Sequence, residues 1–202
     1  MRSLEPTVCD DLPPWCRMVG HSYLGSLGTP NKARYFIQKH EKAQADETAL
    51  EEDKKRAREY EWRLRTRSTG HLKSTVYCRN FSFDVGQAAS FEEKDKYPSA
   101  IEYFTGALSA SLSTAFYTES AKAGLDIDDI EITVKCKLEN VLAHLGLEEG
   151  YPGISQIDLK CFITTMDDPK KVRGIWEQTV NQSPIYATLI KSTDINMKVN
   201  IV

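Results

Sequence analysis

Cysteine and serine are the residue types in this sequence that could act as nucleophiles. The chain has 202 residues, with five cysteines and four histidines. The cysteines are Cys9, Cys16, Cys78, Cys136 and Cys161. Their number is odd and no pair has C-x-x-C spacing, so the sequence favours free thiols over a disulfide framework or a structural zinc site. It predicts neither a metal site nor a bound cofactor.

Two serines lie in motifs that could present a hydroxyl nucleophile. Ser111 lies in an apolar segment with helical spacing, and Ser183 directly precedes Pro184. A serine nucleophile needs an adjacent base, and no histidine is near either serine in the sequence, so a hydrolase would need a distant histidine to converge in the fold. The histidines are His21, His40, His71 and His144. The structural alternative is that Ser111 bonds back to the Ala107 carbonyl and Ser183 caps a helix.

The segment from Ser99 to Gly124 must position Ser111. Its apolar residues recur with the i, i+3, i+4, i+7 spacing of a helical face. They are Ile101, Phe104, Leu108, Leu112, Ala115 and Phe116. Ser99 and Glu102 form an S-x-x-E capping box, and Gly124 is a suitable C-terminal stop. Because small residues cover the remaining surface, we expect a core helix buried on several sides, and its charged residues argue against a membrane span.

Alternating apolar residues predict strands on both sides of this helix. The runs cover residues 60–64, 72–78, 81–85, 130–138, 157–163 and 195–201. Asp168 before Pro169, and Ser183 before Pro184, predict the starts of two more helices. The order β-β-β-α-β-β-α-α-β indicates an α+β fold. Cys136 is predicted on the apolar face of its strand, where a free cysteine behaves as a small buried hydrophobe, and the same holds for Cys161.

The first part of the chain has a different pattern. Residues 1–29 mix Pro, Gly, Asp and Ser without a period and predict an irregular extension. Residues 31–58 are rich in helix formers with a thin apolar stripe, and predict a solvent-exposed helix. Its charged run is interpreted as a solvated face, with a partner surface as the alternative. The sequence therefore divides into an extension, 1–58, and a domain, 59–202.

The charge balance argues against several classes of partner. A net charge of −3 and a pI near 5.9 give no overall basic field, so we expect neither nucleic acid nor a membrane as a partner. The N-terminus lacks the apolar segment of a secretion signal, so we expect a cytoplasmic protein in a reducing environment.

Three local motifs, in order and on the expected elements, carry a family resemblance. They are CRNFSFDVG at 78–86, YPSAIEYFTGALSASLS at 97–113 and QSPIYATL at 182–189. Together they resemble the family of osmotically inducible protein C and organic hydroperoxide resistance proteins (OsmC/Ohr), over roughly Tyr60 to Val202. The resemblance implies antiparallel strands wrapped around a long buried central helix, in an intertwined homodimer with its active sites at the interface.

The family reduces organic hydroperoxides through a peroxidatic and a resolving cysteine, assisted by an arginine and a glutamate. By this resemblance Arg79 matches the arginine, Glu102 the glutamate of the OsmC-like branch, Ser111 the peroxidatic cysteine and Ser183 the second cysteine. In the Ohr branch the glutamate lies one residue earlier, where this chain has Ile101. A hydroxyl cannot become a sulfenic acid, so Ser111 removes the family chemistry. An exposed strand arginine is the alternative for Arg79.

The sequence thus leaves three functional hypotheses. The first is a dimeric OsmC-like protein without thiol chemistry, a binding or regulatory relative of the hydroperoxide reductases that takes a small apolar or peroxide-like ligand at its interface pocket. The second is a hydroperoxide reductase in which Cys9 or Cys16 supplies the thiol, or in which the serines replace natural cysteines. The third is a structural interaction protein that acts through the helix expected at 31–58.

Cys78 directly precedes Arg79 in a predicted strand. Because side chains alternate along a strand, the Cys78 side chain is predicted on the face opposite to that of Arg79.

Overall fold

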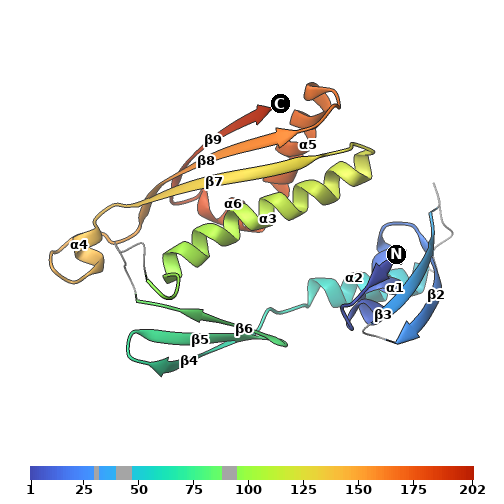
Figure 1. Cartoon of the computed structure of the whole chain (residues 1–202), viewed down its shortest axis with the longest axis horizontal. Coiled ribbons are helices and arrows are strands. Elements are labelled where there is room, and N and C mark those ends of the chain that lie inside the picture. The colour runs from blue at the N-terminus through green and yellow to red at the C-terminus, as the bar shows by residue number, and fades with distance from the viewer. Residues whose placement is uncertain (30–31, 40–46, 88–94) are drawn as a thin grey trace. The chain divides into compact units, whose positions relative to one another are not determined.

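The computed structural model describes residues 1–29, 32–39, 47–87 and 95–202. The chain divides into two compact units, Met1–Arg63 and Leu64–Val202 (Figure 1). Within the described ranges, no helix combines the length and the apolar run that crossing a lipid bilayer requires.

The N-terminal unit consists of a small antiparallel sheet and two helices. Its elements are β1 (Arg2–Ser3), α1 (Val8–Met18), β2 (Ser22–Thr29), β3 (Lys32–Gln38) and α2 (Glu47–Arg58). The strands lie in the order β1-β3-β2. Leu12 and Cys16 of α1 pack with Ala33 and Tyr35 of β3, and these four buried side chains form the core of the unit. An ion pair between Arg17 Nε and Asp53 Oδ2, at 2.6 Å, joins α1 to α2.

Two expectations for this part of the chain are wrong. Residues 1–29 are not irregular, because they form β1, α1 and β2; burial of Leu12 and Cys16 offsets the hydrogen bonds that the two prolines inside α1 remove. The helix expected at 31–58 is confirmed only from Glu47, since Lys32–Gln38 form β3. Lys, Ala and Arg are good helix formers, but intrinsic propensity is a weak determinant, and strand pairing overrides it here. Residues 40–46 of that prediction lie outside the described residues.

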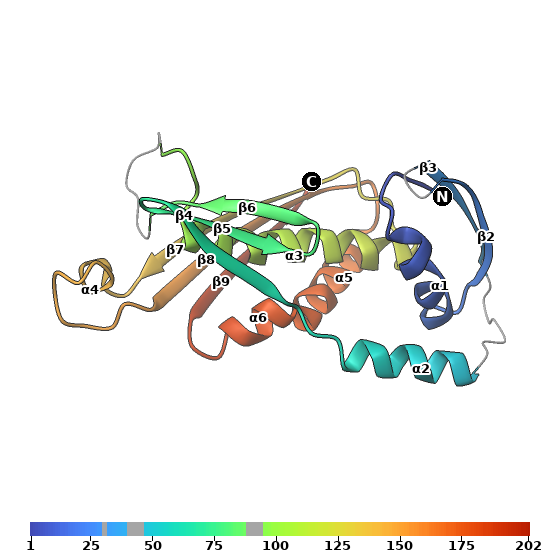
Figure 2. The same ribbon diagram turned by 90° about the horizontal axis from the view of Figure 1, so that it is seen from below.

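The C-terminal unit has the predicted α+β order, with one extra short helix, but its first strand spans Leu64–Gly70 and not the predicted 60–64. Its elements are β4 (Leu64–Gly70), β5 (Lys73–Cys78), β6 (Phe81–Val85), α3 (Ala100–Ala123), β7 (Asp129–Leu138), α4 (Val141–His144), β8 (Ile154–Thr164), α5 (Pro169–Gln182), α6 (Pro184–Leu189) and β9 (Asp194–Ile201). They form two sheets, β4-β5-β6 and β7-β8-β9, and α3 lies between them (Figures 1 and 2). One pair departs from the expected antiparallel arrangement: β9 runs parallel to β8, because α5 and α6 form the crossover between them.

The ends of α3 follow the predicted capping chemistry. The Glu102 amide donates to Ser99 Oγ at 3.3 Å, and the Ser99 amide donates to Glu102 Oε2 at 2.6 Å. Gly124 ends the helix in the left-handed conformation at φ 73°, where glycine has no steric penalty. The capping box and the glycine stop are confirmed.

One core joins α3 to the β7-β8-β9 sheet. Leu108, Leu112 and Phe116 recur every four residues on α3 and are fully buried. The sheet and the following helices contribute the other buried apolar side chains: Ile157, Leu159, Cys161, Ile163, Val172, Trp176, Val180 and Leu189. The Phe116 and Trp176 rings pack edge to face at 5.5 Å.

The expectation that α3 is buried on several sides is wrong for the single chain. Only one stripe of the helix is buried, and Phe104, predicted on the apolar face, is 41% exposed. Tyr117 is also 41% exposed, and Ala107, Ala110 and Thr114 are exposed between the two rings. The helix therefore has an exposed outer face, which consists of Phe104, Ala107, Ala110, Thr114 and Tyr117.

Candidate functional site

Arg79 lies in the two-residue turn between β5 and β6, and not in a strand as predicted. Cys78 pairs with Phe81 across this turn. Arg79 has φ 53°, a conformation that costs a residue other than glycine about 1–2 kcal/mol. The turn directs its guanidinium over the Phe81 ring, 5.5 Å from the centroid. Cys78 lies across from Leu64 and Phe81 at the end of β5.

Glu102 is held by the start of α3. Hydrogen bonds from the Ser99 backbone and side chain lower the pKa of the Glu102 carboxyl below its ordinary value of 4.5. The carboxylate is therefore charged at neutral pH and lies at the positive end of the helix dipole. Its observed partner is Ser99, and no hydrogen bond or ion pair within the described part of the chain joins it to Arg79.

Ser111 lies in the middle of α3, partly buried, at the border between the buried stripe and the outer face. Its hydroxyl donates to the Leu108 carbonyl at 2.9 Å, so the predicted back-bond exists, one residue from the expected Ala107 acceptor. No histidine accepts a proton from Ser111 in the described structure. The arrangement does not provide the base that acyl transfer requires.

Ser183 caps α6, as its position before Pro184 predicts. It is 5% exposed, and its Oγ accepts from the Tyr186 amide at 3.3 Å. Helix α6 packs against α3. The Ser183 oxygen is thus occupied by a backbone donor, and among the described residues no hydrogen bond connects it to Ser111.

Three of the five free cysteines lie in surroundings that suppress thiol reactivity. Burial raises the pKa of Cys161 to about 12 and also raises the pKa of Cys136. Cys16 is fully buried in the core of the N-terminal unit, and its pKa is raised for the same reason. A buried apolar environment suppresses the thiolate that peroxide reduction needs. Cys9 Sγ donates to the Pro6 carbonyl at 3.0 Å.

A polar cluster next to α3 was missed by the sequence analysis. Asp84 Oδ1 accepts from Thr75 Oγ1 at 2.7 Å, and Asp84 Oδ2 pairs with Lys73 Nζ at 3.0 Å. The Tyr103 hydroxyl donates to the Asp84 carbonyl at 2.8 Å. Hydrogen bonds from Thr75 and Lys73 lower the pKa of the Asp84 carboxyl. The aspartate stands in the motif at 78–86, but its partners come from other elements, which the motif does not specify.

The described residues contain no group of three or more His, Cys, Asp or Glu side chains placed to share a metal ion. Nor do hydrogen bonds or ion pairs, in the ranges that the structure covers, link any two of Arg79, Glu102, Ser111 and Ser183. Each of the four side chains has its own local contact. In a single chain, the four side chains therefore do not form one connected site.

A protein-family model described as OsmC-like protein matches residues 93–198. This chain belongs to the OsmC-like family. The match runs from just before α3 into β9, and it includes Glu102, Ser111 and Ser183. Arg79 and the N-terminal unit precede the matched region. No curated protein matches the sequence.

Solved structures support the OsmC/Ohr fold for about seven tenths of the chain. An OsmC-like protein from Mycoplasma pneumoniae is 15% identical, with a TM-score of 0.61 over 71% of this chain and 99% of its own. An organic hydroperoxide resistance protein from Elizabethkingia anophelis is 14% identical, with a TM-score of 0.54 over 71% and 99%. The organic hydroperoxide resistance protein OsmC from Legionella pneumophila is 12% identical, with a TM-score of 0.53 over 70% and 98%. At these identities the likeness concerns the fold.

Proposed function

We propose that this OsmC-like protein is a homodimer that binds a small, partly apolar ligand at the interface, and that it does not reduce hydroperoxides through a pair of thiols. The observation that carries this proposal is the state of the two serines. Ser111 donates to the Leu108 carbonyl, and Ser183 accepts from the Tyr186 amide. Both hydroxyls are hydrogen-bonded to backbone groups of their own helices, and neither can form a sulfenic acid.

The outer face of α3 supports dimerisation. Phe104 and Tyr117 lie at its two ends, with Ala107, Ala110 and Thr114 between them, all exposed. Small side chains let two helices approach closely, and the aromatic rings supply apolar area to bury. A second copy of α3 is the occupant that the family resemblance suggests for this face.

The β4-β5-β6 sheet supports the same conclusion. One face carries Leu64, Val76, Cys78, Phe81 and Phe83, which occupy matching positions in the strand register. The Phe83 and Tyr103 rings contact at 4.8 Å, so this face is turned towards α3. Phe81 nevertheless remains 50% exposed and Leu64 56% exposed. An apolar sheet face left open in one chain is typical of a protein interface.

The proposed pocket combines these two surfaces. Ser111 borders the outer face of α3, and Arg79 stands at the turn that ends the apolar sheet face. A partner protomer packed against both would enclose apolar walls, with one hydroxyl and one guanidinium near the rim. Pockets for small ligands have this composition, an apolar lining with few polar groups.

The hydroperoxide test compares the wild-type protein with Ser111→Cys/Ser183→Cys. Each is mixed with cumene hydroperoxide and a dithiol, and peroxide loss is followed. We expect no loss above buffer for the wild type and measurable turnover for the double variant, because the substitution restores the thiols on an intact fold. Ser113→Cys/Ser183→Cys is the matched control, with its first thiol at another position on the same helix, and it should be inactive.

Activity of the wild-type protein would contradict the proposal. In that case Cys9→Ser/Cys16→Ser should be assayed, and its loss of turnover would identify the N-terminal unit as the source of the thiol.

Ligand binding is tested separately. The purified protein is denatured, and the small molecules released are identified by mass spectrometry against a blank preparation. We expect a stoichiometric apolar compound, and its absence from repeated preparations would count against a ligand-binding role.

A further inference from the structure

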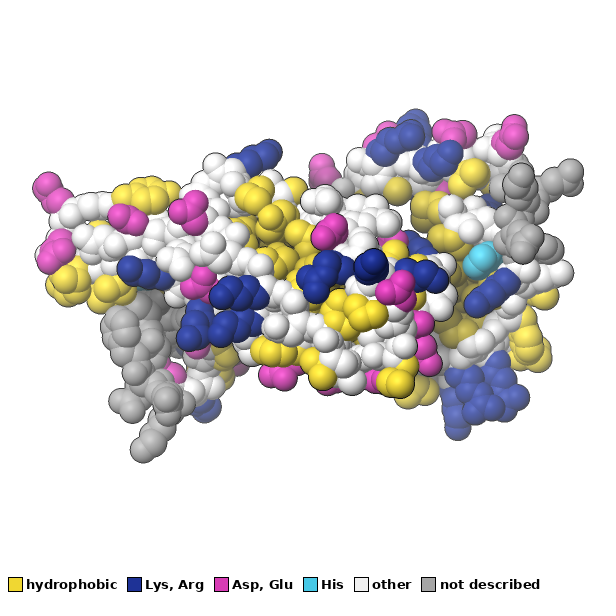
Figure 3. All heavy atoms as spheres, turned by 90° about the horizontal axis from the view of Figure 1, so that it is seen from above, with side chains coloured by type: hydrophobic (Ala, Val, Ile, Leu, Met, Phe, Trp, Pro, Cys, Tyr) yellow, Lys and Arg dark blue, Asp and Glu magenta, His cyan; other side chains and the backbone are white. Residues whose placement is uncertain are grey.

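The exposed face of the N-terminal sheet has an unusual charge distribution. The three strands β1, β2 and β3 contain three charged residues, and all are cations: Arg2, Lys32 and Arg34. Side chains alternate along β3, so Ala33 and Tyr35 are buried towards α1, whereas Lys32, Arg34 and Phe36 are exposed on the other face. The acidic residues of this unit lie outside the strands. The protein is acidic overall, with a net charge of −3, but this surface is locally basic, and Figure 3 shows Lys and Arg side chains gathered over this sheet.

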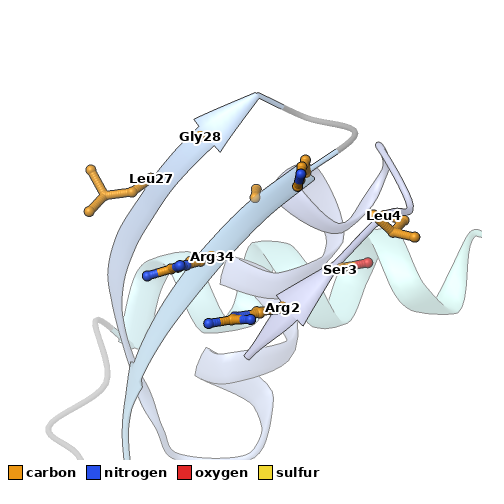
Figure 4. A pocket seen from close by; sticks show the side chains of 8 residues that line it. Arg2, Ser3, Leu4, Leu27, Gly28 and Arg34 are labelled. Carbon is orange, nitrogen blue, oxygen red and sulfur yellow. The ribbon is translucent and has the colours of Figure 1, made fainter.

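Two of these cations are placed against each other. Arg2 and Arg34 are direct partners in the antiparallel β1–β3 register, where like charges destabilise a sheet. In the described part of the chain neither arginine has an acidic partner. Figure 4 shows the two side chains projecting side by side from neighbouring strands. An anion bridging both guanidinium groups would remove the repulsion.

A cavity lies at the same place. Its volume is about 480 Å³. The lining residues are Arg2, Ser3, Leu4, Leu27, Gly28, Lys32, Ala33 and Arg34. All three cations of the sheet thus border it, together with two leucines that are 76% and 66% exposed. The cavity offers positive charge for an anion and apolar side chains for an attached planar or apolar group.

Phe36 continues this face along β3. It is 46% exposed, and its partner in β2 is Gly25, which has no side chain to cover the ring. An uncovered aromatic ring on a sheet, next to a row of cations, is the arrangement on which nucleic acid bases stack while phosphates contact Lys and Arg.

We propose that this face, Arg2, Lys32, Arg34 and Phe36, binds single-stranded nucleic acid. Arg2 and Arg34 contact one backbone phosphate, Lys32 contacts the next, and a base stacks on Phe36. Residues i and i+2 of a strand are roughly 6.6 Å apart, so the cations of β3 form a row along which an extended backbone can run. A sheet face with one open ring favours an unpaired base over a duplex, whose bases are already stacked. This site would correct the expectation that nucleic acid is not a partner.

The test measures fluorescence anisotropy of a labelled oligouridylate titrated with the full-length protein at several salt concentrations. We expect binding that weakens with salt. The salt slope of Arg2→Gln/Arg34→Gln should be smaller by about 0.7, because the two arginines share one phosphate and each neutralised phosphate contributes about 0.7. Phe36→Ala should weaken binding roughly tenfold through lost stacking. Lys55→Gln is the matched control, because Lys55 is exposed on α2 outside the sheet, and it should bind as the wild type does.

Three results would overturn the proposal. The first is no rise in anisotropy at protein concentrations up to about 10⁻⁴ M, the weak end of non-specific binding. The second is equal loss of affinity in Lys55→Gln and Arg2→Gln/Arg34→Gln. The third is binding of vesicles of phosphatidylcholine with phosphatidylserine, or of a duplex, in preference to the single strand. All substituted side chains are exposed, and circular dichroism checks that each variant is folded.

Discussion

The two sheets of the C-terminal unit are built from the same alternating pattern but differ in what covers them. In β8, the inward-facing Ile157, Cys161 and Ile163 are 0% exposed. Of the residues that β4, β5 and β6 contribute, all described, none is buried. Alternation predicts that a strand has an apolar face, and only the packing decides whether that face is buried. The difference indicates which part of the unit is complete in one chain and which part requires a second.

The contacts of the two sheets explain this difference. The β7-β8-β9 sheet packs on α3 and α5 within one hydrophobic core. The β4-β5-β6 sheet is joined to α3 by the Tyr103 contacts with Phe83 and Asp84. We therefore expect substitutions in the first sheet region to change folding stability, and substitutions on the apolar face of the second to change association.

The largest expected effect concerns the core. Phe116→Ala removes a fully buried ring that packs on Trp176, and should lower the free energy of unfolding by about 3–5 kcal/mol. Phe81→Ala removes a phenyl ring of the open sheet that is 50% exposed. In dilute protein it should lower the free energy of unfolding much less than Phe116→Ala does. Urea denaturation of both variants measures the contrast, and equal losses would contradict it.

The next effect concerns association. Phe83→Asp places a charge on the apolar face of β6, and burying it in a dimer interface should weaken association at least about a hundredfold. Ser82→Asp adds the same charge to the opposite face of the same strand and serves as the control. Sedimentation equilibrium should show dissociation of the first variant alone. If both variants associate as the wild type does, this face is not an interface.

A smaller effect is expected at the start of α3, one turn from the Tyr103 contacts with β6. Glu102→Gln should lower stability at neutral pH by about 0.5–1 kcal/mol, since it weakens the capping box. The native pKa of Glu102 is lowered, so its contribution is present above 4.5 and is lost as the pH falls through the native value. Urea denaturation from pH 7 downwards should show the two proteins converging in acid. A difference that persists at low pH would contradict this assignment.

The smallest effect is expected for Ser111→Ala. The Ser111 hydroxyl donates to the Leu108 carbonyl of its own helix, and such back-bonds contribute little to helix stability. The free energy of unfolding should remain within about 0.5 kcal/mol of the wild type. Affinity for the ligand identified from the purified protein should fall, because Ser111 borders the proposed pocket. A stability loss without any change in ligand affinity would instead make Ser111 a structural residue.

Features set by residues close together in the sequence were predicted correctly, and features set by contacts between distant segments were not. Both ends of α3, the Asp168 cap of α5 and the Ser183 cap of α6 were predicted, because capping depends on residues a few positions apart. The β3 strand was missed because its helix-forming residues become a strand only by pairing with β1 and β2. Pairing partners distant in sequence leave no local signal.

The candidate site was predicted in part for the same reason. The local hydrogen bonds of Ser111 and Ser183 followed from helix chemistry, with the acceptor of Ser111 displaced by one residue. The left-handed turn at Arg79 and the partners of Asp84 were not foreseen, since they depend on how three strands pair. The exposed outer face of α3 was not foreseen either, because a helix pattern does not say which chain covers it.

The mass of the wild-type protein in solution decides between a dimer and a monomer. Two chains are expected to complete the open sheet and the outer face of α3. Sedimentation velocity or light scattering should therefore give twice the 22.9 kDa of one chain at micromolar concentration. A stable species of 22.9 kDa would contradict the interface pocket and the function proposed for it.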